Sequence, residues 1–237
     1  MAIELMSFPP SRVVKMSDSS PSPAAIPPIL PEYPEFSCAA VIVAGGQSSR
    51  LGHVPKASLS DGTNTLLDCA LQAVRQASPR VVVGPDTLPV PSDVLLTREN
   101  PPFSGPAAAI HAGLERVAAQ CEGSGTPTPK WCLILGVDTP RIAPAVQRLM
   151  RTAAANDATA RPLDSPASEG FWGVSEGIYQ PLVGIYRYES IRSVFSEGTT
   201  DASVRSFLRR LNPVSVELSA QHTADVDTWE QAERLGY

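Results

Sequence analysis

An uninterrupted apolar run that ends at a pair of glycines constrains the fold of this chain most strongly. Residues 38–44 (CAAVIVA) carry no charged or strongly polar side chain, and Gly45 and Gly46 follow them directly. A strand with one solvated face alternates apolar and polar residues, whereas a strand covered on both faces is apolar throughout. The run therefore predicts a strand in the interior of a sheet that helices cover on both sides.

Further strands and helices are expected to alternate after this run. Leu66, Cys69, Ala70, Ala73 and Val74, for example, lie at helical spacing. The remaining strands are expected at 80–84, 93–97, 131–137, 179–187 and 214–218, and the helices at 65–77, 105–120, 143–155, 201–211 and 228–235. Such repeated strand–helix units are typical of an α/β, Rossmann-like domain with a mostly parallel sheet and helices on both faces. The glycine-containing stretch 157–178 is expected to be an irregular flap or a hairpin.

The first 37 residues differ from the rest in composition. They hold eight of the 24 prolines and many serines, and they show neither strand nor helix periodicity. No apolar segment followed by a small-residue cleavage site is present, so a secretory signal is not indicated. We expect residues 1–37 to be a disordered leader, or an extension from a misassigned start site. One domain is expected over residues 38–237.

Composition excludes several classes of partner. The chain has 19 Lys and Arg against 24 Asp and Glu, a net charge of −5, so nucleic acid is not an expected partner. Its longest apolar runs, such as 131–135, are far shorter than the ~20 residues of a membrane-spanning helix. The four cysteines lie in apolar stretches without CxxC spacing, which favours buried free thiols and a cytoplasmic location. The three histidines lack the spacing of zinc ligands.

The loop after the first strand carries the strongest chemical signal. Residues 44–56 read AGGQSSRLGHVPK. A glycine-rich turn at the carboxyl end of a buried strand exposes backbone N–H groups that can surround phosphate, and Arg50 and Lys56 add positive charge. The spacing fits neither the P-loop nor the dinucleotide-binding fingerprint. The alternative is an ordinary turn with two solvated basic side chains.

The pattern AGGxSxRxGxxxK directly after the first strand resembles the signature of the MobA-like NTP transferases, the family of molybdenum cofactor guanylyltransferases. Four further segments resemble family motifs in the expected order, and together they cover nearly all of residues 38–237: 100–110 (NPPFSGPAAAI), 136–140 (GVDTP), 180–187 (QPLVGIYR) and 224–230 (ADVDTWE). The resemblance implies a single nucleotidyltransferase domain.

The resemblance also implies a role for individual residues. Nucleotide binding would fall to Ala44, Gly45, Gly46, Lys56, Glu99, Asn100 and Gly105, with Arg50 and Lys56 acting on the phosphates during catalysis. Asp138 and Asp225 would bind Mg²⁺. The position of Asp138 agrees with this independently, since ligands bind at the carboxyl ends of strands in open α/β sheets. The competing interpretation makes Asp138 a cap of the helix at 143–155, and makes Asp227 or Thr228 a cap of the last helix.

The implied reaction is the transfer of GMP from GTP to molybdopterin, which yields molybdopterin guanine dinucleotide and pyrophosphate. Four departures from the guanylyl pattern, at Pro55, Ala109, Asp225 and Asp227, leave open a CTP-dependent molybdopterin cytidylyltransferase or transfer to another small phosphate. A non-catalytic module that binds GTP or the cofactor is a further alternative, and a plain structural α/β protein is the remotest. Molybdoenzymes or other cofactor-synthesis proteins are the implied protein partners.

Overall fold

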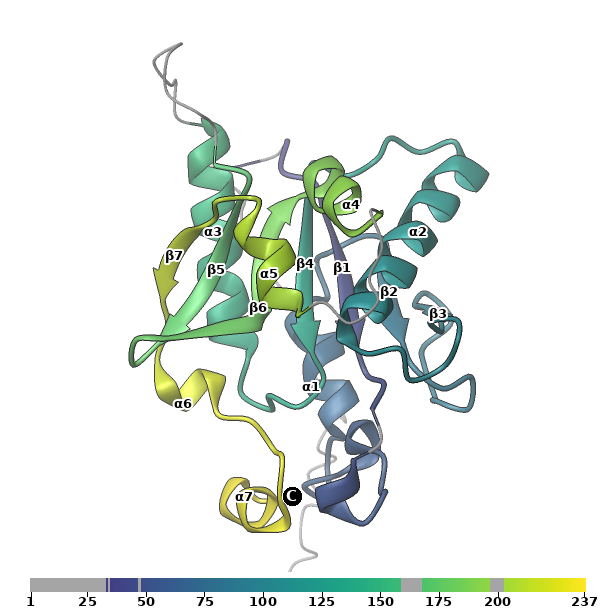
Figure 1. Ribbon diagram of the computed structural model, residues 1–237, viewed down its shortest axis with the longest axis vertical. Helices are drawn as coiled ribbons and strands as arrows, with labels where there is room; N and C mark the ends of the chain where they lie inside the picture. Colours follow the sequence, from purple (N-terminus) through teal and green to yellow (C-terminus); the bar gives the residue numbers. More distant parts are fainter. Residues whose placement is uncertain (1–32, 34, 47, 159–167, 197–202) are drawn as a thin grey trace, which may run out of the picture.

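The computed structural model describes residues 33, 35–46, 48–158, 168–196 and 203–237 (Figure 1). In this part of the chain, seven strands form one sheet in the order β3-β2-β1-β4-β6-β5-β7. Neighbouring strands are parallel except where β6 pairs with β4 and with β5. The strands are β1 (Cys38–Val43), β2 (Arg80–Val83), β3 (Leu95–Thr97), β4 (Trp131–Gly136), β5 (Gly170–Ser175), β6 (Ile178–Arg187) and β7 (Val214–Glu217). The expected mostly parallel α/β sheet is confirmed.

Helices cover both faces of the sheet, and β1 is apolar throughout because its side chains pack into the core on both faces. Ala40 and Ile42 pack into the core under α1 and α3, whereas Ala39 and Val41 pack on the other face under α2, α4 and α5. All six residues of β1 are buried. The helices are α1 (Leu66–Ala73), α2 (Pro106–Ser124), α3 (Ala143–Ala158), α4 (Tyr188–Ser196), α5 (Val204–Arg209), α6 (Ala220–Thr223) and α7 (Trp229–Leu235), and the short 3₁₀ helices are η1 (Ser49–Leu51) and η2 (Lys56–Ser58).

Every strand and helix expected from the sequence is present, but the stretch before β6 corrects one expectation. Residues 170–175 are a buried strand rather than an irregular flap, and with β6 they form the hairpin that was the other possibility. The glycines serve close packing here. An added Cβ at Gly170 would lie 2.3 Å from Cδ1 of Tyr186, and one at Gly173 would lie 2.4 Å from Cδ1 of Leu218.

Helix α4 was not expected, although its pattern is present in the sequence. Tyr188, Ile191 and Phe195 recur at helical spacing and are buried. They follow β6 without a turn signal, so the helix is hidden behind the end of a strand.

Several expectations concern residues outside the described part of the chain. Most of the leader predicted over 1–37 falls on 1–32 and 34, and part of the flap falls on 159–167. The division into a leader and a domain over 38–237 therefore stays a prediction. Among the described residues, no helix is long and apolar enough to cross a membrane. The four cysteines, all of them described, form no disulfide.

The topology determines which loops meet. Because β2, β1 and β4 are adjacent and parallel, their carboxyl ends lie at the same edge of the sheet. The glycine-rich loop follows β1, and Asp138 follows β4 shortly after its last residue. The loop and the aspartate are therefore neighbours at this edge.

Candidate functional site

The loop after β1 leaves the sheet along a strongly curved path. The N–H of Ala44 donates to the carbonyl of Val83 at 2.8 Å, which ties the start of the loop to β2. Gly46 then has a φ of +135° and Gly52 a φ of +62°, conformations that glycine adopts without steric cost. An added Cβ at Gly46 would meet no atom within 4 Å, so this stretch of backbone borders open space.

Lys56, at the start of η2, points to two carboxylates from distant parts of the chain. Its Nζ lies 3.5 Å from Oδ2 of Asp138 and also forms an ion pair with Asp227. Burial of the ammonium group opposes its charge, but the hydrogen bond to Asp227 and the charges of Asp138 and Asp227 outweigh this effect. The pKa of Lys56 is therefore raised above its ordinary value.

Asp138 takes its position from the end of β4. Val137 N–H donates to the carbonyl of Val43 at 3.1 Å, which continues the pairing of β4 with β1 up to the aspartate. Helix α3 begins only at Ala143, and the Asp138 carboxylate contacts Lys56 and Thr139 instead of the helix. These contacts favour a site residue over a helix cap.

The segment before α7 brings two more carboxylates to the same place. The N–H of Val226 donates to the carbonyl of Asp138 at 2.9 Å, which holds Asp225 and Asp227 beside the end of β4. Thr228 caps α7 in a capping box with Gln231, so the Asp227 carboxylate is available to Lys56.

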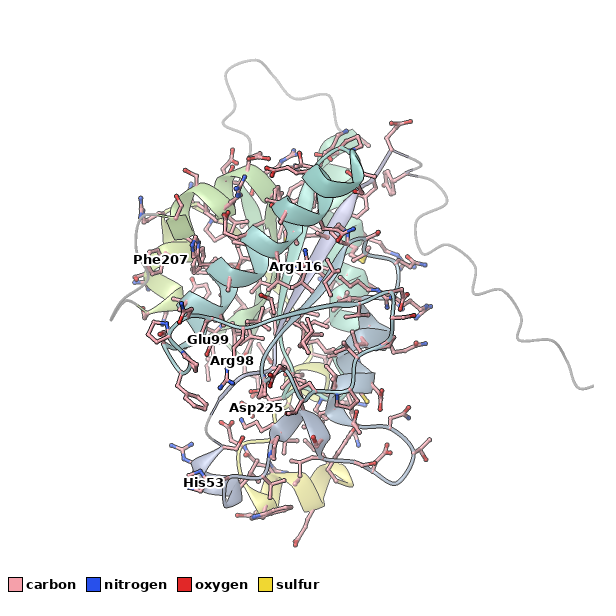
Figure 2. The ribbon with its side chains drawn as sticks, turned by 90° about the vertical axis from the view of Figure 1, so that its right-hand side faces the viewer. His53, Arg98, Glu99, Arg116, Phe207 and Asp225 are labelled. Carbon is pink, nitrogen blue, oxygen red and sulfur yellow. The ribbon has the colours of Figure 1, made fainter. Side chains whose placement is uncertain are left out.

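Asp225 is exposed, but its surroundings still shift the pKa of its carboxylate. Its partial burial, followed by the charges of Asp227 and Asp138, raises the pKa of Asp225. In Figure 2, the labelled side chains of Glu99 and Asp225 lie toward the same end of the molecule, although they come from opposite halves of the sequence.

Glu99 is a buried carboxylate in the wall of the same site. It is 6% exposed, and its Oε1 accepts a hydrogen bond from the N–H of Phe103 at 2.9 Å. Its Oε2 is buried and has no hydrogen-bond partner within the described part of the chain. Because a buried carboxylate oxygen without a donor is costly, Glu99 is suited to a ligand that brings an N–H or O–H group.

These groups surround a cavity of about 460 Å³, within the size range of small-molecule sites. Seven of the ten site residues expected from the sequence line it: Gly45, Gly46, Arg50, Lys56, Glu99, Gly105 and Asp138. Ala44, Asn100 and Asp225 do not line it, and Asn100 is exposed to solvent.

The cavity also contains residues that the sequence did not single out as site residues. Asp227 is the most important of them, followed by Phe103 and Leu182. The sequence pattern gives Asp227 only a possible role as a helix cap. Its position two residues after Asp225 was the available signal, since alternate residues of an extended segment share a side.

The metal-binding side chains of the described residues are spread out rather than clustered. Among the residues that the structure describes, no three or more His, Cys, Asp or Glu side chains are grouped closely enough to hold a metal ion by themselves. The cavity combines exposed loop backbone, two basic side chains and several carboxylates. This combination is suited to a phosphate ligand that binds together with a cation.

Comparison with solved structures shows that the fold is shared with other proteins. The fold resembles Rv0371c from Mycobacterium tuberculosis H37Rv, at 19% identity and a TM-score of 0.64 over 84% of this chain and 97% of that one. A structure of Rv0371c as a complex with manganese is also similar, at 18% identity and a TM-score of 0.58 over 84% and 98%.

Two other solved structures also have a similar fold. Molybdopterin-guanine dinucleotide biosynthesis protein A from Archaeoglobus fulgidus is 14% identical, with a TM-score of 0.57 over 83% of this chain and 95% of that one. The 2-C-methyl-D-erythritol 4-phosphate cytidylyltransferase from Thermus thermophilus is 17% identical, with a TM-score of 0.60 over 85% and 99%. At these identities the likeness concerns the fold.

No curated protein matches the chain. The family model of the MobA-like NTP transferase domain, however, matches residues 40–215, from within β1 to β7. This match covers well over half of the chain and includes the glycine-rich loop, Glu99 and Asp138. The chain therefore belongs to the MobA-like NTP transferase family.

Proposed function

We propose that the protein is a Mg²⁺-dependent nucleotidyltransferase that transfers GMP from GTP to molybdopterin carrying molybdenum. The products would be molybdopterin guanine dinucleotide and pyrophosphate. The observation that carries the proposal is the convergence of the glycine-rich loop, Lys56 and Asp138 on one cavity. Family membership supports the reaction class.

The phosphates of the donor would bind to the loop after β1. The backbone at Gly45 and Gly46 offers N–H groups to phosphate oxygens, whereas the N–H of Ala44 is already donated to Val83 and Ala44 would only hold the start of the loop. The flexible side chains of Arg50 and Lys56 supply positive charge. Arg50 is exposed and Lys56 is half-buried, so both can reach a ligand in the cavity.

Asp138 and Asp225 are the proposed Mg²⁺ ligands, and the geometry adds Asp227. The residues fit the ion, because Mg²⁺ sites commonly use one or two carboxylates and take further oxygens from substrate phosphates and water. The position of the Lys56 ammonium group, which pairs with both Asp138 and Asp227, supports a cation site at these carboxylates. When bound, Mg²⁺ would neutralise charge on the phosphates of the donor. The manganese complex of Rv0371c supports a divalent ion.

The reaction requires little covalent participation by the protein. A phosphate oxygen of the acceptor would attack the α-phosphorus of GTP, the bond from that phosphorus to the β-phosphate oxygen would break, and pyrophosphate would leave. The acceptor phosphate is already ionised at neutral pH, so no general base is needed. Lys56 and Arg50 would orient the triphosphate and stabilise the negative charge that develops on the leaving group.

Glu99 supports guanine as the donor base. The Oε2 of this buried carboxylate can accept an N–H, and guanine presents N1–H and an N2 amino group side by side to such an acceptor. Phe103, which also lines the cavity and is 55% exposed, offers an aromatic face to a planar base. Gly105 lies beside them at the start of α2.

CTP is the second candidate donor. Pro55 stands before Lys56, the ending that cytidylyltransferase relatives share, and a cytidylyltransferase is among the similar folds. Cytosine presents one amino group, which could donate to the free Oε2 of Glu99 but would lack the second neighbouring donor that guanine brings.

The test is a product assay with the full chain. The protein is incubated with Mg²⁺, molybdenum-loaded molybdopterin and either GTP or CTP labelled at the α-phosphate. The dinucleotide is measured by its label, and the unlabelled pyrophosphate is measured separately. We expect the guanine dinucleotide with wild type and with Lys130→Met, a control at the opposite end of β4, and no product with Asp138→Ala. Formation of the cytosine dinucleotide alone would move the donor to CTP. Normal turnover by Asp138→Ala would overturn the metal assignment.

A further inference from the structure

The side chain of Lys56 lies where a cation belongs. Its ammonium group contacts Asp138, which follows β4, and Asp227, which precedes α7. We propose that Lys56 acts as an internal counter-cation that occupies the metal position in the nucleotide-free protein, so that a divalent ion binds tightly only once nucleotide phosphates draw the lysine away. This inference rests on the proposed function, because it takes the two carboxylates as metal ligands.

The backbone fixes the carboxylates independently of the lysine. The hydrogen bond from Val226 N–H to the carbonyl of Asp138 holds the two segments together, and the pairing of β4 with β1 holds Asp138. The carboxylates would therefore stay close to each other if Lys56 left, and their repulsion would need another cation. A divalent ion is the natural replacement, since carboxylate oxygens are hard ligands.

The backbone at Lys56 is equally well held, so that only its side chain needs to move. Ser58 N–H donates to the carbonyl of Pro55 at 3.0 Å, and Leu59 N–H donates to the carbonyl of Lys56 at 3.0 Å. The four-carbon stem of lysine is flexible and carries its charge as a compact group. Because Lys56 lines the same cavity as Gly45 and Gly46, phosphates bound on that loop would be within the side chain's reach.

In this geometry the ammonium group of Lys56 and a divalent ion compete for the same two carboxylates. Without nucleotide, a divalent ion must displace an ammonium group that has two carboxylate partners, and the displaced charge has no new anion to contact. With nucleotide, the triphosphate supplies that anion and leaves Asp138 and Asp227 to the metal. By linkage, each of nucleotide and metal should then strengthen the binding of the other.

The experiment measures Mn²⁺ binding to the full chain in the absence of nucleotide, by electron paramagnetic resonance of the free ion. We expect weak binding to wild type and binding that is about tenfold tighter or more in Lys56→Met, the size of coupling seen for charges in contact. Lys56→Gln, which keeps a polar side chain, should show the same gain in Mn²⁺ affinity. It replaces Lys56→Met in the experiment if that variant folds poorly. Adding Asp138→Asn to either variant should abolish the gain.

Two controls separate occupancy from a general change in charge. Arg50→Met removes one positive charge from the same loop, and Arg50 takes part in none of the ion pairs found in the described part of the chain. Lys130→Met removes one positive charge from the opposite end of β4. Both should change Mn²⁺ affinity far less than Lys56→Met does.

The outcomes distinguish this inference from the proposed function when GTP binding with Mg²⁺ is measured on the same samples. If wild type binds GTP but Lys56→Met and Lys56→Gln bind free Mn²⁺ no more tightly than wild type, the counter-cation role is overturned and the proposed function stands. An equal gain in Arg50→Met would also overturn it. If wild type binds no nucleotide, the proposed function fails, while a gain confined to the Lys56 variants would still support the lysine as the resident cation.

Discussion

Adding a single methyl group at Gly136 should displace the Asp138 carboxylate while changing the stability of the fold only slightly. Gly136 is the last residue of β4, and a Cβ built on it would lie 2.8 Å from Oδ1 of Asp138 and 3.4 Å from Cδ1 of Leu182. The first separation is too short for non-bonded carbon and oxygen atoms, so Gly136→Ala must move the carboxylate.

The size of the effect follows from the displacement. To reach ordinary contact, the Asp138 carboxylate must swing by about half an ångström or more. The ammonium group of Lys56, which contacts this carboxylate, and the end of the Leu182 side chain can both move. The cost in folding free energy should therefore stay below about 1 kcal/mol. A displacement of about 1 Å at a reacting centre lowers rates by about 100-fold. We therefore expect Gly136→Ala to lower turnover by roughly ten- to a hundredfold.

Pyrophosphate release measures the turnover, and urea denaturation measures the free energy of unfolding. Gly123→Ala is the matched control, because an added Cβ in this part of α2 meets nothing within 4 Å. It should leave turnover unchanged. Wild-type turnover by Gly136→Ala would refute the view that Asp138 must lie where the structure has it, and a large loss of stability would refute the view that the carboxylate yields at low cost.

Three further changes test other parts of the structure. Replacing Glu99 with Gln should lower the preference for GTP over CTP by roughly ten- to a hundredfold, because a charged acceptor is lost; an unchanged ratio in a competition assay would contradict its role toward the base. The raised pKa of Asp225 means that stability falls as pH rises from its unfolded value of about 3.9 through the higher folded value. Asp225→Asn should therefore raise the Tm of the nucleotide-free protein at pH 7 and have little effect near pH 3, and an equal shift at both values would argue against this cause. In α2, a Cβ at Gly113 would lie 2.4 Å from Cγ1 of Val41 and 3.0 Å from Cγ2 of Val83, so Gly113→Ala should destabilise by about 1–3 kcal/mol in urea, whereas a neutral effect would contradict the close packing of α2 on the sheet.

The fold was largely predictable because its strands are covered on both faces. The apolar run in β1 identifies an interior strand without knowledge of its neighbours, and the short apolar runs at β2 and β4 do the same. The hairpin of β5 with β6 was harder. Its glycines suggest irregular structure until the ring of Tyr186 is seen to need the space beside Gly170.

The site was predictable where one continuous motif carries it and less so where distant segments meet. The loop from Gly45 to Lys56 is local, so sequence alone could indicate its chemistry. The ion pair of Lys56 with Asp227 joins residues far apart in sequence, through a backbone contact between Val226 and Asp138. No local pattern reveals that contact, and a capping role for Asp227 was equally consistent with the sequence. The free oxygen of Glu99 likewise depends on where Phe103 places its N–H.

Nucleotide binding by the full chain tests most directly whether the cavity holds a nucleoside triphosphate, on which the proposed transfer depends. Isothermal titration with GTP, CTP and ATP, each with and without Mg²⁺, requires no acceptor. We predict binding that depends on Mg²⁺, favours GTP, and is greatly weakened in Asp138→Ala. Preference for CTP would assign the chain to the cytidylyl branch. Absence of binding by all three nucleotides, with and without Mg²⁺, would contradict the proposal that the loop after β1 holds a nucleoside triphosphate.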